Sequence, residues 1–314
     1  MKKYEIYFFG SDYSFVSAFF LYSLISFTKR NKKFKIKHIV NTDTFFSFDQ
    51  DSLIYKLKNK IKFLIYFFFN KKYYSLEKNI NEEFNIKKSI KKQASLNKIP
   101  FSHFDNFKKN NSRDNSILLN VGGIKIFPKK FLDRFKICIN YHNAELPRFR
   151  GANSNSMSLM YNKIFTYFSF HYVNAKIDRG YVFYKNKIKI FKKIKHHLFY
   201  ENLKIKSASN NIHKILTKAL SNEKSKSLPL KRGGYYPMDY HKKFFLNINQ
   251  FPYKEIQKHI DIFGGIYYMN NFITGIKKSS TGISLKDCKI KITEIKYFPV
   301  IIYKILIFLS VIKS

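Results

Sequence analysis

The sequence predicts an α/β protein built on an open, mostly parallel sheet with helices on both faces. Residues 4–9 and 34–41 are short apolar runs of the strand type, and residues 12–28 between them carry aromatic side chains at helical spacing. A strand, a helix and a strand within about forty residues form a βαβ unit, which requires a parallel pair. Apolar runs at residues 116–121 and 136–140 extend the same sheet.

Further elements are expected along the chain, and Asp12 is expected to cap the first helix. Helices are predicted at residues 51–69, 85–97, 131–135, 211–222 and 251–262, and one or two strands at 285–297. Residues 223–234 are rich in Lys, Ser and Gly, which indicates a linker. We therefore expect a main domain over residues 1–200 and a small α+β region over residues 201–314.

The composition allows a large core and leaves the meaning of the charge open. Of the 314 residues 45% are hydrophobic, and the formal net charge is +39. Such a charge favours a polyanionic partner. However, abundant Lys, Asn, Ile, Phe and Tyr together are typical of an AT-rich genome, and the lysines are spread along the whole chain. We expect no DNA partner.

Several cofactor classes are disfavoured. The first strand is followed by a single glycine, Gly10, so the G-x-G-x-x-G pattern of dinucleotide binding is missing. The two cysteines, Cys138 and Cys288, form no C-x-x-C pair, and no other metal-ligand cluster stands out. We therefore expect no metal. We also expect a cytoplasmic location, since Glu5 and the turn at Gly10 interrupt any signal-peptide pattern.

The informative chemistry lies between residues 139 and 180. Asn140 and His142 are two residues apart at the end of a predicted strand, so both side chains point to one face. An amide and an imidazole on one face can grip one small polar group. Asp178, from a distant loop, would complete an acid/base set.

This segment resembles the formyltransferases that use 10-formyltetrahydrofolate. It carries N-x-H, then L-P-x-x-x-G ending at Gly151, then D-x-G ending at Gly180. The resemblance implies a Rossmann-like sheet and transfer of a formyl group to a primary amine. It also implies that Asn140 and His142 donate to the formyl oxygen, and that Asp178 orients His142 and accepts the proton of the amine.

The resemblance further implies a folate site around the loop after the predicted strand at residues 116–121 and around the L-P turn. Its expected residues are Gly122, Gly123, Ile124, Ile126, Pro128, Leu146 and Pro147. His171 also matches a position that is often histidine in the family, and we assign it no chemistry. Arg179 stands where Thr or Ala is usual, and Glu145 where Ser or Leu is usual. These departures leave open a non-catalytic member that binds folate or a partner.

Two acceptors of the formyl group remain as alternatives. Residues 151–155 and 170–172 resemble sugar formyltransferases, which favours the amine of an amino-sugar nucleotide. Length and positive charge suit methionyl-tRNA instead, but the GAAPI run of that subfamily is missing.

The apolar residues 298–312 are predicted to form a buried helix, and the alternative is an anchor on an anionic membrane surface.

Overall fold

The computed structural model describes most of the predicted main domain and part of the C-terminal region. The described residues are 3–12, 14–43, 89–107, 114–123, 125–162, 164–191, 197–223, 233–236, 248–263, 265–268 and 271–296. The helix predicted at residues 51–69 and the apolar stretch 298–312 lie outside these ranges. Within them, no helix is both long and apolar enough to cross a membrane.

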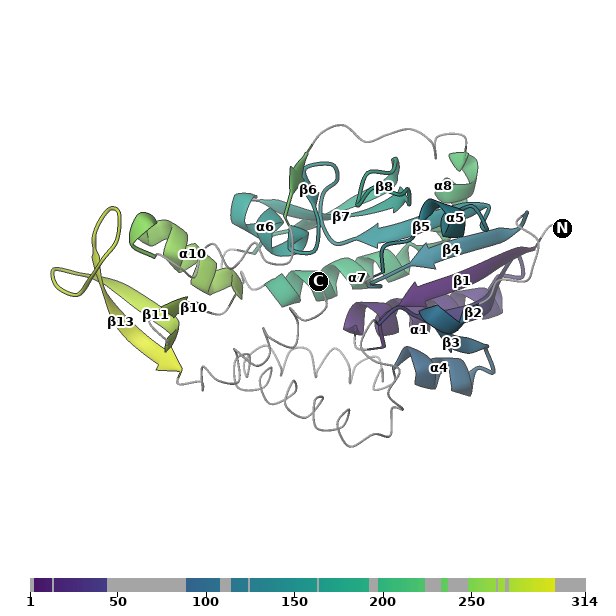
Figure 1. The fold of residues 1–314 in the computed structure, drawn as a ribbon, viewed down its shortest axis with the longest axis horizontal. Coiled ribbons are helices and arrows are strands. Elements are labelled where there is room, and N and C mark those ends of the chain that lie inside the picture. The colour runs from purple at the N-terminus through teal and green to yellow at the C-terminus, as the bar shows by residue number, and fades with distance from the viewer. Residues whose placement is uncertain are drawn as a thin grey trace.

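The main sheet confirms the predicted fold class (Figure 1). Its strands are β1 (Tyr4–Gly10), β2 (Phe34–Asn41), β3 (Phe101–His103), β4 (Ser116–Asn120), β5 (Ile137–His142), β7 (Phe165–Tyr172) and β8 (Val182–Lys189). They lie in the order β3-β2-β1-β4-β5-β7-β8. The first five are parallel, whereas β7 and β8 are antiparallel to their neighbours. The sequence did not predict these last two strands.

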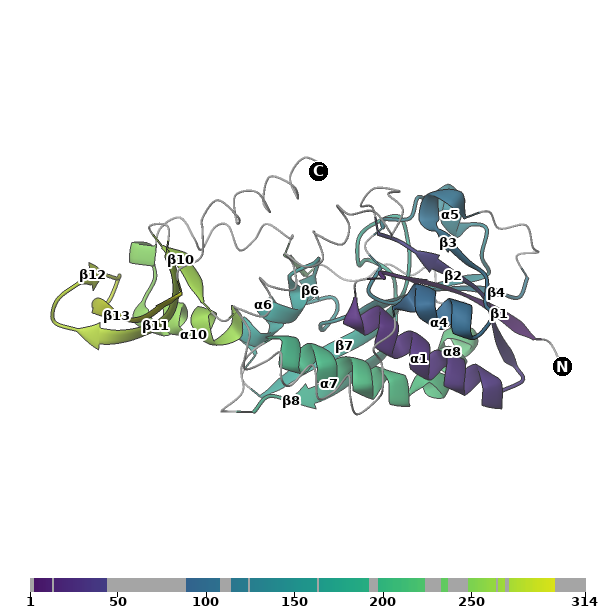
Figure 2. The ribbon, with the colours of Figure 1, turned by 90° about the horizontal axis from the view of Figure 1, so that it is seen from below.

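Helices cover both faces of this sheet. One face carries α1 (Phe15–Arg30), α4 (Ile90–Leu96), α7 (His197–Asn210) and α8 (Ile212–Ser221). Figure 2 shows α1 and α7 side by side below the strands. The other face carries the short helices η1 (Phe104–Asn106) and α5 (Lys129–Leu132).

The start of α1 differs from the prediction. Ser14, not Asp12, is the N-cap, and its side chain accepts a hydrogen bond from the Ser17 N–H at 3.4 Å. Asp12 lies in the turn before the helix, too early to reach the first free N–H groups. Its carboxylate instead accepts from the backbone N–H of Lys91 at 3.0 Å, which joins the turn after β1 to α4.

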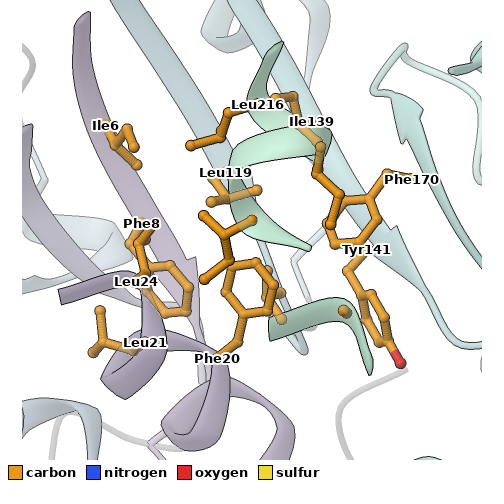
Figure 3. Close-up of a cluster of buried hydrophobic side chains, with 14 of the residues drawn as sticks. Ile6, Phe8, Phe20, Leu21, Leu24, Leu119, Ile139, Tyr141, Phe170 and Leu216 are labelled. Carbon is orange, nitrogen blue, oxygen red and sulfur yellow. The ribbon is translucent and has the colours of Figure 1, made fainter. Parts of the chain in front are cut away.

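Alternation along the strands builds two cores. On β5, Ile139 and Tyr141 point into the core beneath α1, together with Leu119 and Phe170 from the neighbouring strands (Figure 3). Cys138 belongs to the core on the opposite face. Because side chains alternate along a strand, the even-numbered residues of β5 share the face of Cys138. The fold therefore places both polar side chains at the end of β5 on this second face.

Beyond the main sheet lies the expected α+β region (Figure 1). It comprises η4 (Ile248–Gln250), α10 (Tyr253–Phe263), and an antiparallel sheet of β10 (Ile266–Tyr268), β11 (Asn271–Ser279), β13 (Lys289–Lys296) and β12 (Ile283–Ser284). Isoleucines from α10 and the sheet form its own core. Helix α10 also contacts α6 (Ser154–Tyr161), which joins the two parts.

Helices α7 and α8 bear on the domain organisation. Apart from the first residues of α7, both helices lie beyond residue 200, where the main domain was predicted to end. Even so, Ile205, Ile212 and Leu216 belong to the core beneath α1. The boundary at residue 200 remains a prediction. The packing shows that the main sheet extends its core at least as far as Ala219.

Candidate active site

A row of three polar side chains crosses the sheet at the carboxyl ends of β4 and β5. Asn120, Asn140 and His171 are direct register partners on β4, β5 and β7. The Asn120 side chain donates through Nδ2 to Asn140 Oδ1 at 2.8 Å, and Asn140 Nδ2 lies 3.0 Å from His171 Nε2. The carboxyl edge of an open parallel sheet is where such folds bind ligands.

This row fixes the orientation of the Asn140 amide. His171 Nδ1 lies 2.9 Å from the carbonyl oxygen of Tyr172, which can only accept, so Nδ1 carries the proton. In a neutral His171, Nε2 then accepts from Asn140. The second N–H of the Asn140 amide has no partner among the described residues. Asn140 is half-buried, so this N–H is available to a ligand.

His142 is the next residue of β5 on the same face, and it is buried. Its Nε2 lies 2.6 Å from the carbonyl oxygen of Phe149, so Nε2 donates this bond. Ser169, its register partner on β7, holds the following turn by donating to the carbonyl of Ala144 and accepting from the Leu146 N–H. Burial lowers the pKa of His142, and the Asp178 carboxylate opposes part of this effect.

Asp178 lies in the loop between β7 and β8, within reach of both imidazoles. Its Oδ2 lies 3.5 Å from His142 Nδ1, and its Oδ1 lies 3.6 Å from His171 Nε2. The backbone N–H of Gly151 donates to Oδ2 at 2.8 Å. Burial opposes ionisation of Asp178, but the two imidazoles and this N–H outweigh it and hold the pKa of Asp178 well below its usual range.

The two motif glycines allow this approach. Gly151 has φ +92°, which disfavours any other residue, and a Cβ there would lie 2.5 Å from the carbonyl oxygen of Tyr236. A Cβ on Gly180 would lie 1.5 Å from the carbonyl oxygen of Tyr172. Asp178 itself adopts φ 51°, a left-handed conformation that Asp tolerates better than most residues. The chain around Asp178 is therefore built for close contact with the sheet.

At neutral pH this arrangement supplies one oriented N–H donor, one neutral imidazole and one ionised carboxylate. His142 Nδ1 bears a lone pair, because the proton of the neutral ring is on Nε2. A proton that arrives at Nδ1 would form an imidazolium next to the Asp178 carboxylate. The set can thus stabilise negative charge on an oxygen and take up a proton. In the described ranges no three His, Cys, Asp or Glu residues gather closely enough to hold a metal ion.

The residues predicted to bind folate belong to two segments, the loop after β4 and the turn after β5. Gly122 and Gly123 follow β4, and a Cβ on Gly123 would lie 2.1 Å from Asn120 Oδ1. Among the others, Leu146 is buried and Pro147 follows a cis peptide bond, whereas Ile126 and Pro128 are exposed. Ile124 lies outside the described residues.

The sequence reasoning missed two members of the site. It gave His171 no chemistry, although His171 contacts both Asn140 and Asp178. It did not select Asn120 at all. An Asn at the end of one strand carries no signal in sequence, because its significance comes from its partner on the neighbouring strand.

Comparison with known proteins agrees with these features. The model of the formyl transferase family matches residues 64–216, a range that includes Asn140, His142 and Asp178. Among curated proteins, no sequence matches the chain.

Solved structures share the fold at low sequence identity. An N-formyltransferase from Helicobacter canadensis, in complex with folinic acid and dTDP-3-aminofucose, superposes with a TM-score of 0.53 at 13% identity and covers 90% of each chain. A 4-N formyltransferase from Francisella tularensis gives 0.55 at 11% identity, over 94% of this chain and 99% of that one. WlaRD, a sugar 3N-formyl transferase, gives 0.53 at 15% identity, over 90% and 88%.

Proposed function

We propose that this chain is a folate-dependent formyltransferase, whose family model matches residues 64–216, and that it transfers the formyl group of 10-formyltetrahydrofolate to the primary amine of an amino-sugar nucleotide. The observation that carries the proposal is the convergence of three side chains from distant parts of the chain. Asn140 and His142 share one face of β5, and the loop that holds Asp178 returns to the same point.

The first step of the proposed reaction is attack of the neutral amine nitrogen on the formyl carbon. A C–N bond forms and negative charge develops on the formyl oxygen. The free N–H of Asn140 donates to this oxygen, and its orientation is fixed in advance by Asn120 and His171. A preorganised donor of this kind stabilises the transition state by about 3–4 kcal/mol. In this structure the Nε2 proton of His142 is already bound by Phe149, so we assign the donation to Asn140.

The second step is loss of the amine proton and collapse of the intermediate. The proton moves to His142 Nδ1, directly or through a water molecule, and the resulting imidazolium is stabilised by the Asp178 carboxylate. The bond between the formyl carbon and N10 of the folate then breaks. N10 leaves as tetrahydrofolate after taking up a proton, and the formyl oxygen becomes the carbonyl of the amide product.

Several observations support a small acceptor rather than tRNA. The solved structures with this fold include one in complex with dTDP-3-aminofucose and one determined in the presence of dTDP. In the C-terminal region, β9 (Gly234–Tyr235) pairs with β6 (Phe149–Arg150) beside the site. The half-exposed ring of Tyr235 lies 5.8 Å from the Arg150 guanidinium. We propose that residues 201–314 take part in acceptor binding through this contact.

The proposal includes a cytoplasmic location for the reaction. Cys138 and Cys288 are both free thiols in the structure. Free thiols fit a reducing compartment.

Calorimetry and a panel of acceptors test the proposal together. The folate probe is 5-formyltetrahydrofolate, which is stable and resembles the donor. We expect it to bind, and we expect formyl transfer from 10-formyltetrahydrofolate to a dTDP-linked amino sugar but not to methionyl-tRNA. Absence of folate binding at about millimolar ligand would contradict the enzyme assignment. Transfer to the tRNA alone would contradict the choice of acceptor.

A further inference from the structure

Lys204 of α7 is a fully buried lysine close to the proposed active site. Its side chain is 0% exposed, and its Nζ lies 2.9 Å from the carbonyl oxygen of Asn143 and 2.6 Å from Asn155 Oδ1. Asn143 directly follows His142, and Asn155 lies in the first turn of α6. A buried amine that donates to the residue next to a proposed catalytic histidine requires a physical explanation.

The surroundings of Lys204 are costly for a cation. Both of its acceptors are neutral, and burying a charge without a directly paired ion is unfavourable. Burial lowers the pKa of Lys204 to about 7, although the carboxylate of Glu201 opposes this effect. A neutral amine keeps two N–H groups, which match the two acceptors. Lys204 can therefore hold both partners on either side of neutral pH.

The two partners of Lys204 lie at the two ends of one loop. Between Asn143 and Asn155 the chain supplies the Phe149 carbonyl, which accepts from His142, and the Gly151 N–H, which donates to Asp178. Helix α7 also holds the first end through Glu201, whose carboxylate accepts from the Asn143 side chain at 2.9 Å. Fixing both ends of the loop thus fixes the groups that orient the proposed acid/base pair.

We propose that Lys204 is a positioning residue, whose Nζ closes the loop from Asn143 to Asn155 and thereby holds the His142 imidazole in place against Asp178. The inference rests on the proposed function. It explains why a polar amine occupies a site in which a Met of similar length would avoid the desolvation cost. Lys204 also belongs to the electrostatic surroundings of His142: burial is the main cause that lowers the pKa of His142, Asp178 raises this pKa, and His171 and Lys204 lower it further.

The test compares Lys204→Met with Lys214→Met, the same change at an exposed position of α8. The measurements are the melting temperature, the affinity for 5-formyltetrahydrofolate, kcat, and the titration of the His142 ring by NMR. For Lys204→Met we expect a lower melting temperature, because the Asn143 carbonyl and Asn155 Oδ1 lose their donor, and unchanged folate affinity. We expect kcat to fall by about ten-fold or more because the loop is no longer held. We also expect the pKa of His142 to rise, since a positive neighbour has been removed. Lys214→Met is expected to match the wild type throughout.

A kcat within about twofold of the wild type, or an unchanged titration of His142, would overturn the proposal. If Lys204→Met does not fold, Asn155→Leu removes the other end of the same link, and its kcat is expected to fall in the same way. A wild-type kcat in that variant would also overturn it. If the wild type itself transfers no formyl group, the proposed function fails, and the His142 titration still decides whether Lys204 positions this ring.

Discussion

Asn140 is held from both sides by side chains of neighbouring strands. Asn120 donates to its oxygen, and His171 accepts from its nitrogen, so a flip of the amide would break both contacts. One N–H is left pointing away from both partners. The proposed catalytic use of Asn140 therefore depends on Asn120 and His171 as well.

This dependence predicts the effect of Asn120→Asp. The new carboxylate has nearly the same shape but cannot donate to Asn140 Oδ1, and it repels that oxygen. We expect the Asn140 amide to lose its fixed orientation and kcat to fall by about ten-fold or more, with little change in folate affinity. Steady-state kinetics check it, with Asn106→Asp at an exposed position as the control. Equal kcat values in the two variants would mean that Asn120 has no part in orienting Asn140.

The pH dependence of kcat follows from His142. The proposed reaction needs a neutral ring to receive the amine proton, and burial lowers the pKa of His142 from its ordinary 6.5. Activity should therefore persist as the pH falls to 6.5 and decline only below it. Asp178 stays ionised throughout this range, because its own pKa is held well below the usual value. A pH–kcat profile that rises toward acid would show that the protonated ring is the active form.

At the scale of elements, strand register and tight loops assemble the site. Asn120, Asn140 and His171 meet because β4, β5 and β7 pair in the observed register. Asp178 reaches them only because the loop after β7 passes close to the strand at Gly180. A small change in this loop should therefore affect chemistry as well as folding.

Gly180→Ala tests this coupling. Its Cβ would collide with the carbonyl oxygen of Tyr172, so the loop must shift and carry Asp178 with it. We expect a lower melting temperature and a kcat reduced by about ten-fold or more. Gly275→Ala is the matched control, because its Cβ would lie 2.5 Å from Thr293 Oγ1 in the small sheet. That variant should lose stability but keep its kcat, and a normal kcat in both variants would contradict the account.

The elements also show what the sequence could and could not predict. The βαβ start and the N-x-H pair were predictable, because apolar runs and a two-residue spacing are local patterns. Strands β7 and β8 were not predicted, although residues 165–172 are rich in aromatic side chains and Asp178 and Gly180 mark a turn between the two strands. Asn120 and His171 could not be selected, because their role depends on strand order and register, which no local pattern encodes. The helix cap was misassigned by two residues because Asp12 and Ser14 are both favoured capping residues, and the local pattern does not show which of them directly precedes the helix.

For the whole molecule, the positive charge gains a role if the acceptor is a nucleotide. With a formal net charge of +39, the protein should attract an anionic sugar nucleotide over long range. We expect kcat/KM for the acceptor to fall several-fold as salt rises from about 0.05 to about 0.5 M, while kcat stays nearly constant. Kinetics at a series of salt concentrations check this. A kcat/KM that is independent of salt would indicate that the lysines reflect composition alone.

The most direct test of the central claim is formyl transfer by the wild type and by Asp178→Asn. The asparagine keeps the size of the aspartate but cannot stabilise an imidazolium at His142, an interaction needed only during the reaction. We predict that the wild type converts 10-formyltetrahydrofolate and an amino-sugar nucleotide to tetrahydrofolate and the formamide. The variant should bind 5-formyltetrahydrofolate normally yet turn over about a hundred-fold or more slowly. A variant that turns over at nearly the wild-type rate would contradict the account, because Asp178 would then be only a turn residue.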